Sequence, residues 1–338
     1  MEKYKNIRIK NIMQNIILLS LVVPVFNEQE TIQIFIEKIN EVFIDYVDTI
    51  KIEIVFVNDG SSDNTLDILL NTQNNIYKQH NFINIKVIDF SRNFGKEAAL
   101  SAGLNNISGD IIVPIDVDLQ DPPELIIEMI KKWEQGFDVV LAKRSNRDSD
   151  SWAKKQSANW FYKLHNKISS PKIPDNVGDF RLMDKKVVQT LSNLPENHRF
   201  MKGLFAWVGF RTTTIEYSRP ERSAGESKFN GWKLWNFALE GITSFSTTPL
   251  RIWTYVGSFF ALLSFIFMFY TIIRVFVHGV DIPGYASIIA LITFFGGLQL
   301  IGIGIIGEYL GRTYIESKRR PIYVIRKIYD ITDDKKVD

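Results

Sequence analysis

The segment Asp116-Val117-Asp118-Leu119-Gln120 offers the clearest chemistry in this sequence. Two carboxylates two positions apart, followed by an amide oxygen, are the hard oxygen ligands that Mg²⁺ and Mn²⁺ prefer. An ion held by so few protein groups completes its coordination shell with water and with the phosphates of a substrate. A solvated strand end is the alternative interpretation, because Asp-x-Asp is a common pattern.

Composition excludes several other kinds of site. The 338 residues carry a net charge of +2, which gives no reason to expect a nucleic-acid partner. The chain has no cysteine, so disulfides, Cys-based zinc sites and thiol nucleophiles are absent. No two of the four histidines are spaced as a metal-binding pair, so we do not expect a histidine-driven mechanism.

Five apolar runs separated by helical stretches predict the sheet that positions the acidic segment. They are Ile17–Val25, Ile52–Asn58, Ile85–Phe90, Ile111–Asp116 and Asp138–Lys143. Several are apolar throughout, which is typical of parallel strands covered on both faces. The pattern predicts a doubly wound α/β domain, in which ligands bind beyond the carboxyl ends of the strands.

Three polar clusters follow these predicted strands. They are Asn27-Glu28, Asp59-Gly60-Ser61-Ser62, and Asp116 with Asp118. The glycine and serines of the second cluster are explained by a turn and a helix cap. The turn and the cap do not explain Asp59, which is placed to accept hydrogen bonds from a base or ribose. Because separate segments bring carboxylates to the same edge of the predicted sheet, a cation site at Asp116 and Asp118 is favoured over a solvated strand end.

At Asp121-Pro122-Pro123-Glu124 the prolines predict the start of a helix. Asp121 is placed to cap that helix, and we expect this local role to be its whole contribution.

Two uncharged stretches near the C-terminus predict membrane-spanning helices at about 252–274 and 284–307. Each can cross a hydrocarbon core of about 30 Å at about 1.5 Å per residue. Their short link makes a hairpin, and buried core helices are the alternative. Basic residues flank the pair, at Arg251 on one side and Arg312 and Lys318 on the other, which places the N-terminal domain in the cytoplasm. No cleavage site follows the apolar run Ile16–Val23, so a first strand fits better than a signal peptide.

Two further segments are expected near the membrane. Aromatic residues recur at helical spacing over Trp232–Phe245, which predicts an amphipathic interfacial helix, with packing against the domain as the alternative. The segment Ile322–Tyr329 is expected to be an extended cytoplasmic tail that pairs with another subunit. Glycines in the second span are compatible with a dimer or tetramer.

Ordered motifs resemble those of family 2 glycosyltransferases. They are Leu21–Glu28, Val57–Asp63, Asp89–Glu97 and Asp116–Pro123. Three more segments resemble the polyprenyl-phosphate subgroup, which includes dolichol-phosphate mannose synthases and bactoprenol glucosyltransferases: Gly178–Leu182, Arg222–Lys228 and Thr247–Arg251. The resemblance covers nearly the whole chain. It implies a GT-A fold, a nucleotide-sugar donor, a divalent cation and a lipid phosphate acceptor.

The implied organisation has four parts. A cytoplasmic GT-A domain with a Rossmann-like, mainly parallel sheet spans 1–228, and a membrane-interface helix spans 229–250. Two transmembrane helices lie within 251–308, and a cytoplasmic tail spans 309–338.

The resemblance also implies roles for individual residues. Nucleotide-sugar binding is expected from Pro24, Phe26, Glu28, Val57, Asp59, Asp116, Val117, Asp118 and Gln120. The implied ligands of Mg²⁺ or Mn²⁺ are Asp116, Asp118 and Gln120. Asn58 departs from the family, in which many members carry a second Asp.

The chemistry that follows is displacement of a nucleoside diphosphate from the anomeric carbon. Charge builds on the leaving phosphate, where a metal stabilises it, so Asp118 is assigned a catalytic role. The acceptor phosphate is already anionic, with a second pKa of about 6, so a strong base is dispensable. Asp179 is expected to orient acceptor and sugar, with base catalysis allowed but not required. Its alternative role is a loop Asp paired with Arg181.

An anionic lipid head requires cations near the membrane. Lipid-phosphate binding is expected from Arg144, Arg147, Arg222 and Lys228, and the last two are also assigned catalytic roles. For Arg147 and for Arg219 in the later basic loop, a solvated basic loop is an equal alternative.

The resulting prediction is an inverting transferase of the bacterial plasma membrane, multi-pass, with both termini in the cytoplasm. UDP-glucose and undecaprenyl phosphate are the expected substrates, and the product would serve glycosylation of a surface polymer. Alternative donors are UDP-GlcNAc, UDP-galactose, GDP-mannose and UDP-aminoarabinose. A processive polysaccharide synthase or a non-catalytic scaffold is the alternative class. The nearest string to the synthase motif Gln-x-x-Arg-Trp, Gln156–Trp160, lacks the arginine.

Overall fold

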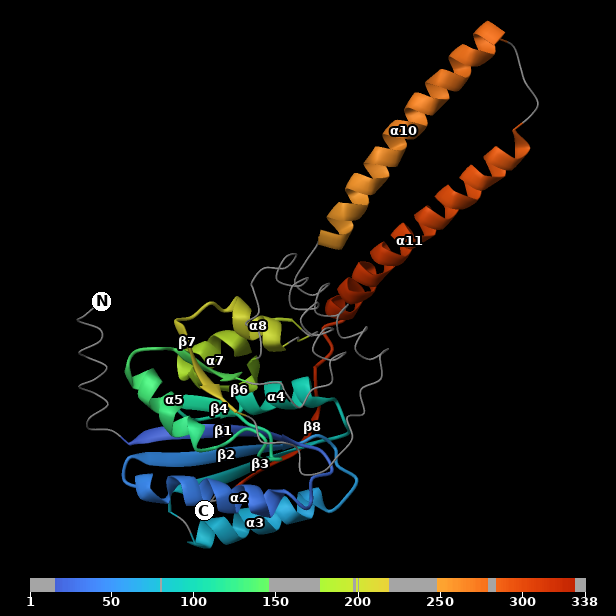
Figure 1. The fold of residues 1–338 in the computed structure, drawn as a ribbon. Helices are drawn as coiled ribbons and strands as arrows, with labels where there is room; N and C mark the ends of the chain where they lie inside the picture. The colour runs from blue at the N-terminus through green and yellow to red at the C-terminus, as the bar shows by residue number, and fades with distance from the viewer. Residues whose placement is uncertain are drawn as a thin grey trace.

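A mixed eight-stranded sheet organises the part of the chain that the structure describes. The structure is a computed structural model that describes residues 16–79, 81–145, 177–196, 199, 201–218, 248–278 and 284–331. Its strands neighbour one another in the order β7-β5-β6-β4-β1-β2-β3-β8 (Figure 1). They are β1 (Ile17–Val25), β2 (Ile50–Asn58), β3 (Ile83–Phe90), β4 (Ile111–Pro114), β5 (Val139–Arg144), β6 (Val177–Asp184), β7 (Thr212–Tyr217) and β8 (Ile325–Asp330).

Some predictions concern residues outside these ranges. They are the roles of Arg147, Arg222 and Lys228, the absent synthase motif at Gln156–Trp160, and the interfacial helix up to residue 247.

The centre of the sheet is parallel and covered on both faces. β4, β1, β2 and β3 pair in parallel, with Leu21 opposite Ile54 and Val113. In β1, Leu21 faces one apolar cluster and the next residue, Val22, faces another, and both are fully buried. The helices that cover the sheet are α2 (Ile32–Phe43), α3 (Thr65–Gln79), α4 (Lys96–Asn105), α5 (Leu125–Glu134), α7 (Lys185–Ser192) and α8 (Met201–Trp207). The continuous apolar runs therefore arise from burial on both faces, as expected.

Two strands of the sheet, β6 and β7, were not predicted, and the third, β8, was expected only as an extended tail. β6 is antiparallel to β4 and β5, and β8 is antiparallel to β3, while β7 pairs in parallel with β5. The centre of the sheet is parallel as predicted, but the antiparallel pairs on both sides of it make the whole sheet mixed. These strands carry charged or exposed residues at many positions, so they lack the apolar signal on which the prediction relied.

The C-terminal tail differs most from expectation. The helix α11 (Tyr285–Ser317) runs ten residues past the predicted end at 307, and β8 then joins β3 of its own chain instead of another subunit. Lys86 of β3 pairs with Asp330 at 3.1 Å, and Arg326 pairs with the buried Asp89 at 3.3 Å. β8 supplies the backbone partners that the edge of β3 would otherwise lack.

Two long helices project together away from the sheet (Figure 1). They are α10 (Thr248–His278) and α11. Phe260 of α10 contacts Phe295 of α11 with ring centroids 5.6 Å apart, and the Trp253 indole packs against Gly302. Among the described residues, one helical segment, Phe294–Ser317, is long and apolar enough to cross a membrane, and Ile252–Phe267 is a shorter apolar segment.

Candidate active site

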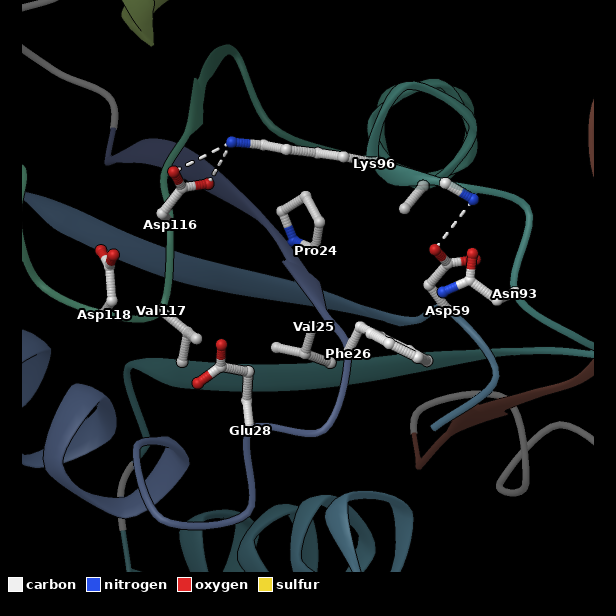
Figure 2. A pocket seen from close by; sticks show the side chains of 12 residues that line it. Pro24, Val25, Phe26, Glu28, Asp59, Asn93, Lys96, Asp116, Val117 and Asp118 are labelled. Atoms are coloured by element: carbon white, nitrogen blue, oxygen red, sulfur yellow. Dashed lines mark hydrogen bonds and ion pairs between the residues drawn. The ribbon is translucent and has the colours of Figure 1, made fainter. Parts of the chain in front are cut away.

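A cavity of about 340 Å³ opens at the carboxyl ends of the parallel strands. Figure 2 shows its lining side chains converging from β1, β2, the loop before α4 and the loop after β4. The lining residues are Pro24, Val25, Phe26, Glu28, Asp59, Asn93, Gly95, Lys96, Ala99, Asp116, Val117 and Asp118. Seven of the predicted donor-site residues are among them. Val57 lies fully buried in the apolar cluster under α4, and Gln120 is not part of the lining.

The loop after β4 directs two carboxylates into this cavity. Between them, Val117 is buried in the core and anchors the loop, and Asp116 and Asp118 line the cavity on either side of it (Figure 2). Asp118 Oδ1 accepts the backbone N–H of Gln120 at 3.1 Å. Leu119 has a φ of 55°, a left-handed conformation that costs free energy for a branched residue. The backbone therefore stores strain where the acidic pair is presented.

Lys96 joins this loop to Asp179, a contact that the sequence did not predict. Its Nζ lies 2.7 Å from Asp116 Oδ1 and 3.3 Å from Asp179 Oδ2. Burial by itself lowers the pKa of Lys96, but the two carboxylates more than offset it and hold the pKa above its usual value. Burial likewise raises the pKa of Asp179, but the nearby charges of Lys96, Lys202 and Arg181 together more than offset it and hold the pKa below its usual value, so Asp179 is ionised at neutral pH.

Arg181 does not take the role that the alternative interpretation of Asp179 gave it. Its guanidinium donates to the backbone carbonyl oxygens of Gly178 at 2.6 Å and Asp179 at 3.3 Å. It also stacks on the ring of Phe205, 4.0 Å from the ring centroid. The salt-bridge partner of the Asp179 carboxylate is Lys96.

Asp59 anchors the loop that leads to Lys96. Its two carboxylate oxygens accept the backbone N–H groups of Phe94 at 2.7 Å and Gly95 at 2.9 Å. Burial raises the pKa of Asp59, and the two backbone hydrogen bonds oppose the rise. Gly60 is required beside it, because a methyl group there would lie 2.4 Å from the backbone carbon of Arg92. Asp59 lines the cavity, yet both of its oxygens already serve the protein backbone.

The departure at Asn58 has a structural reason. Its side-chain amide donates to Asp89 Oδ1 at 2.8 Å, and both residues are buried. An aspartate at position 58 would place a second negative charge against Asp89. The asparagine found here donates a hydrogen bond to Asp89 and adds no charge.

The carboxylates of the cavity fit an open cation site. Burial raises the pKa of Glu28, and the nearby negative charges of Asp118 and Asp116 raise it further. Among the described residues, no three carboxylate or imidazole groups converge to enclose a metal ion. An all-oxygen set with few protein ligands suits Mg²⁺ or Mn²⁺ when substrate phosphates complete the shell. Asp116 and Asp118 are the residues placed to hold such an ion.

Asp121 belongs to the site's support, so the prediction that it only caps a helix is wrong. α5 begins after Glu124, and no side-chain cap bond is made there. Asp121 is buried, accepts a hydrogen bond from the Tyr217 hydroxyl and lies 3.9 Å from the Arg144 guanidinium. Burial and, as the second cause, the hydrogen bond and charge of Asp121 raise the pKa of Tyr217 to about 12. Arg144 is therefore already in contact with an anionic partner.

Glu97 gives the site a pH dependence that can be measured. Burial, reinforced by Asp179, raises its pKa from 4.5 to about 7, against the opposing effect of the Met201 N–H and of Lys202 and Lys96. The pKa of Glu97 is higher in the folded state than in the unfolded state. The contribution of this group to the free energy of unfolding is therefore fully present below about pH 4.5 and is lost as the pH rises through about 7. We expect Glu97→Gln to remove this dependence.

Denaturant titrations of the detergent-solubilised protein test this prediction. Between about pH 5 and about pH 8, the free energy of unfolding of the wild type should fall by about 2 kcal/mol more than that of the variant. Glu128→Gln, at an exposed position of α5, should keep the wild-type dependence. Parallel curves for wild type and Glu97→Gln would contradict the prediction.

Comparisons with known proteins agree with the geometry. The profile described as Glycosyl transferase family 2 matches residues 20–192, and the profile described as GtrB C-terminal hairpin matches residues 248–313. The bactoprenol glucosyl transferase of Shigella phage SfV is 55% identical over 308 residues, covering 91% of this chain and 98% of that protein. The prophage bactoprenol glucosyl transferase homolog of Escherichia coli strain K12 is 53% identical, covering 92% of this chain and 99% of that protein. The resemblance inferred from the motifs is confirmed by these matches.

A solved structure is also similar. It is the glucosyl-3-phosphoglycerate synthase of Mycobacterium tuberculosis with Mn²⁺, UDP-glucose and phosphoglyceric acid. It covers 70% of this chain and 80% of its own, with 16% identity and a TM-score of 0.44.

Proposed function

The chain belongs to glycosyl transferase family 2, and from this premise we propose that it transfers glucose from UDP-glucose to bactoprenol (undecaprenyl) phosphate. The observation that carries the proposal is identity of 55% across 98% of a bactoprenol glucosyl transferase, in a chain whose acidic loop lines a cavity of about 340 Å³. The product is a lipid-linked glucose phosphate for glycosylation of a surface polymer.

The donor is assigned to the cavity. Phe26 and Pro24 offer an apolar wall for the base, and Glu28 and Asp59 line the same side. Asp116 and Asp118 would hold Mg²⁺ or Mn²⁺ at the diphosphate. Such an ion supplies charge stabilisation to the leaving phosphate. Val57 and Gln120 are not among the residues that line the cavity, and their roles in donor and metal binding stay predictions.

The acceptor is assigned to the side of Asp179. This carboxylate is ionised at neutral pH and lies within the same ion-pair cluster as Asp116. A phosphate acceptor carries its own negative charge, so Asp179 orients the reactants and need not remove a proton. Attack from this side, opposite the departing diphosphate, inverts the anomeric centre. Arg144, Arg147, Arg222 and Lys228 remain the proposed partners of the lipid phosphate.

The membrane arrangement supports a lipid acceptor. We assign α10 and α11 to a two-span hairpin, based on the apolar sequence of both helices and the match to a C-terminal hairpin family. Basic residues at both ends of the hairpin favour a cytoplasmic sheet domain at a bacterial plasma membrane. Assembly into a dimer or tetramer is compatible with this arrangement.

Extraction of the lipid product tests the proposal. Purified full-length protein is incubated with UDP-[¹⁴C]glucose, undecaprenyl phosphate and Mn²⁺, and the organic phase is counted. Label in the lipid phosphate fraction, lost on addition of EDTA, is the expected result. Label from GDP-mannose or UDP-GlcNAc but not UDP-glucose would overturn the sugar assignment. Label only in polymer, or in no product, would overturn the reaction itself.

A further inference from the structure

Lys96 lies where the proposed reaction has no assigned cation. Its side chain starts at the first residue of α4 and extends across the mouth of the cavity to Asp116 (Figure 2). The ammonium contacts both oxygens of Asp116, at 2.7 and 2.9 Å, and Asp179 at 3.3 Å. One cation thus bridges the donor-side and acceptor-side carboxylates.

The backbone of Lys96 is fixed, but its ammonium can move. Gly95, immediately before it, has a φ of 97° and donates its N–H to Asp59 at 2.9 Å. The side chain itself is 45% exposed, on a flexible four-carbon stem with three donors. Rotation about the side-chain bonds can therefore carry the charge from Asp116 to another anion in the cavity.

Asp116 cannot serve two cations equally well. A divalent cation held there would lie within a few ångströms of the ammonium, and the two like charges repel. A nucleoside diphosphate brings the opposite charge to the same place, and a lysine ammonium is a common partner of phosphate oxygens. The ammonium therefore gains by moving once the diphosphate is bound.

We propose that Lys96 is a further donor-binding residue with two alternating partners. In the free protein its ammonium neutralises Asp116 and Asp179. When a nucleoside diphosphate binds with its divalent cation, the ammonium leaves Asp116 for the diphosphate and stays beside Asp179. This inference rests on the proposed donor site.

Removing the charge should change two affinities in opposite directions. In Lys96→Met, Mn²⁺ alone should bind about tenfold more tightly, because a competing cation is gone. UDP in saturating Mn²⁺ should bind about tenfold more weakly, because a charged contact to the diphosphate is lost. If Lys96 had a purely structural role, its replacement would not strengthen the binding of Mn²⁺ while weakening the binding of UDP.

The experiment uses the full-length protein in detergent, without sugar transfer. Free Mn²⁺ is measured by electron paramagnetic resonance, and UDP binding is measured by calorimetry. Lys38→Met is the matched control, because Lys38 also bridges two carboxylates, Glu41 at 3.1 Å and Glu124 at 2.8 Å, but lies outside the cavity. It should leave both affinities unchanged. Lys96→Arg keeps the charge and should retain UDP binding within about threefold.

The outcomes separate this inference from the proposed function. A wild type that does not bind UDP contradicts the donor site itself. A wild type that binds UDP, with Lys96→Met unchanged in both affinities or weaker in both, overturns the role of Lys96. If Lys96→Met does not fold, judged by its elution and melting, Lys96→Gln carries the same two measurements.

Discussion

Asp118→Asn should reduce glucose transfer by about a hundredfold or more, because it removes a charge aimed at the diphosphate site. The carboxylate is exposed in the cavity, and within the described part of the chain it accepts a local hydrogen bond from the Gln120 N–H at 3.1 Å. Asparagine keeps an oxygen for that bond, so the turn at Leu119 should persist. The loss should therefore appear in chemistry and metal dependence, with membrane insertion and melting temperature unchanged.

Asp63→Asn is the matched control for this substitution. Asp63 makes the same local bond, accepting the N–H of Thr65 two residues later at 3.0 Å, but it does not line the cavity. Its variant should transfer glucose at close to the wild-type rate in the lipid-extraction assay. Near-normal transfer by Asp118→Asn would remove the acidic loop from the centre of the mechanism.

Asp179→Asn should lower transfer by about tenfold to a hundredfold. The substitution removes one of the two charges that hold Lys96. It also removes the carboxylate that we propose faces the acceptor. Because the acceptor phosphate is already anionic, some activity should remain at all pH values where that phosphate is ionised. Initial rates of lipid labelling, measured against pH with saturating UDP-glucose, test both statements.

A control on the same strand separates this effect from damage to β6. Asp184 ends β6 and caps α7 by accepting the Lys186 N–H at 3.1 Å, far from the cavity lining. Asp184→Asn should leave transfer close to wild type. Complete loss of activity in Asp179→Asn at every pH would instead support an obligatory base, and unchanged activity would exclude Asp179 from the site.

Most of the residues that line the cavity could be predicted because they follow local signals. Parallel strands buried on both faces leave continuous apolar runs, and their carboxyl ends must meet at one edge. The polar residues after β1, β2 and β4 therefore had to converge, and Glu28, Asp59, Asp116 and Asp118 do line one cavity. Ordered motifs added the donor chemistry and the lipid acceptor.

The predictions failed where a residue's partner lies far along the chain. Asp121 precedes two prolines and reads locally as a cap, but its partner Tyr217 comes from a strand 96 residues later. The segment of β8 was predicted to be extended, but its partner, β3 of the same chain, was not predicted. The strand β8 forms because the edge of β3 needs backbone partners and because Lys86 and Asp89 find opposite charges on it.

The sequence by itself determined the parallel centre of the sheet, the acidic loop and the apolar hairpin segments, since each depends on residues close together in the chain. Only the tertiary structure decided that Asp59 serves the backbone of the next loop and that this loop delivers Lys96 to Asp116 and Asp179. Lysine is an ordinary residue at the start of a helix. Its role appears only when folding brings carboxylates 20 and 83 positions away to within about 3 Å of its ammonium.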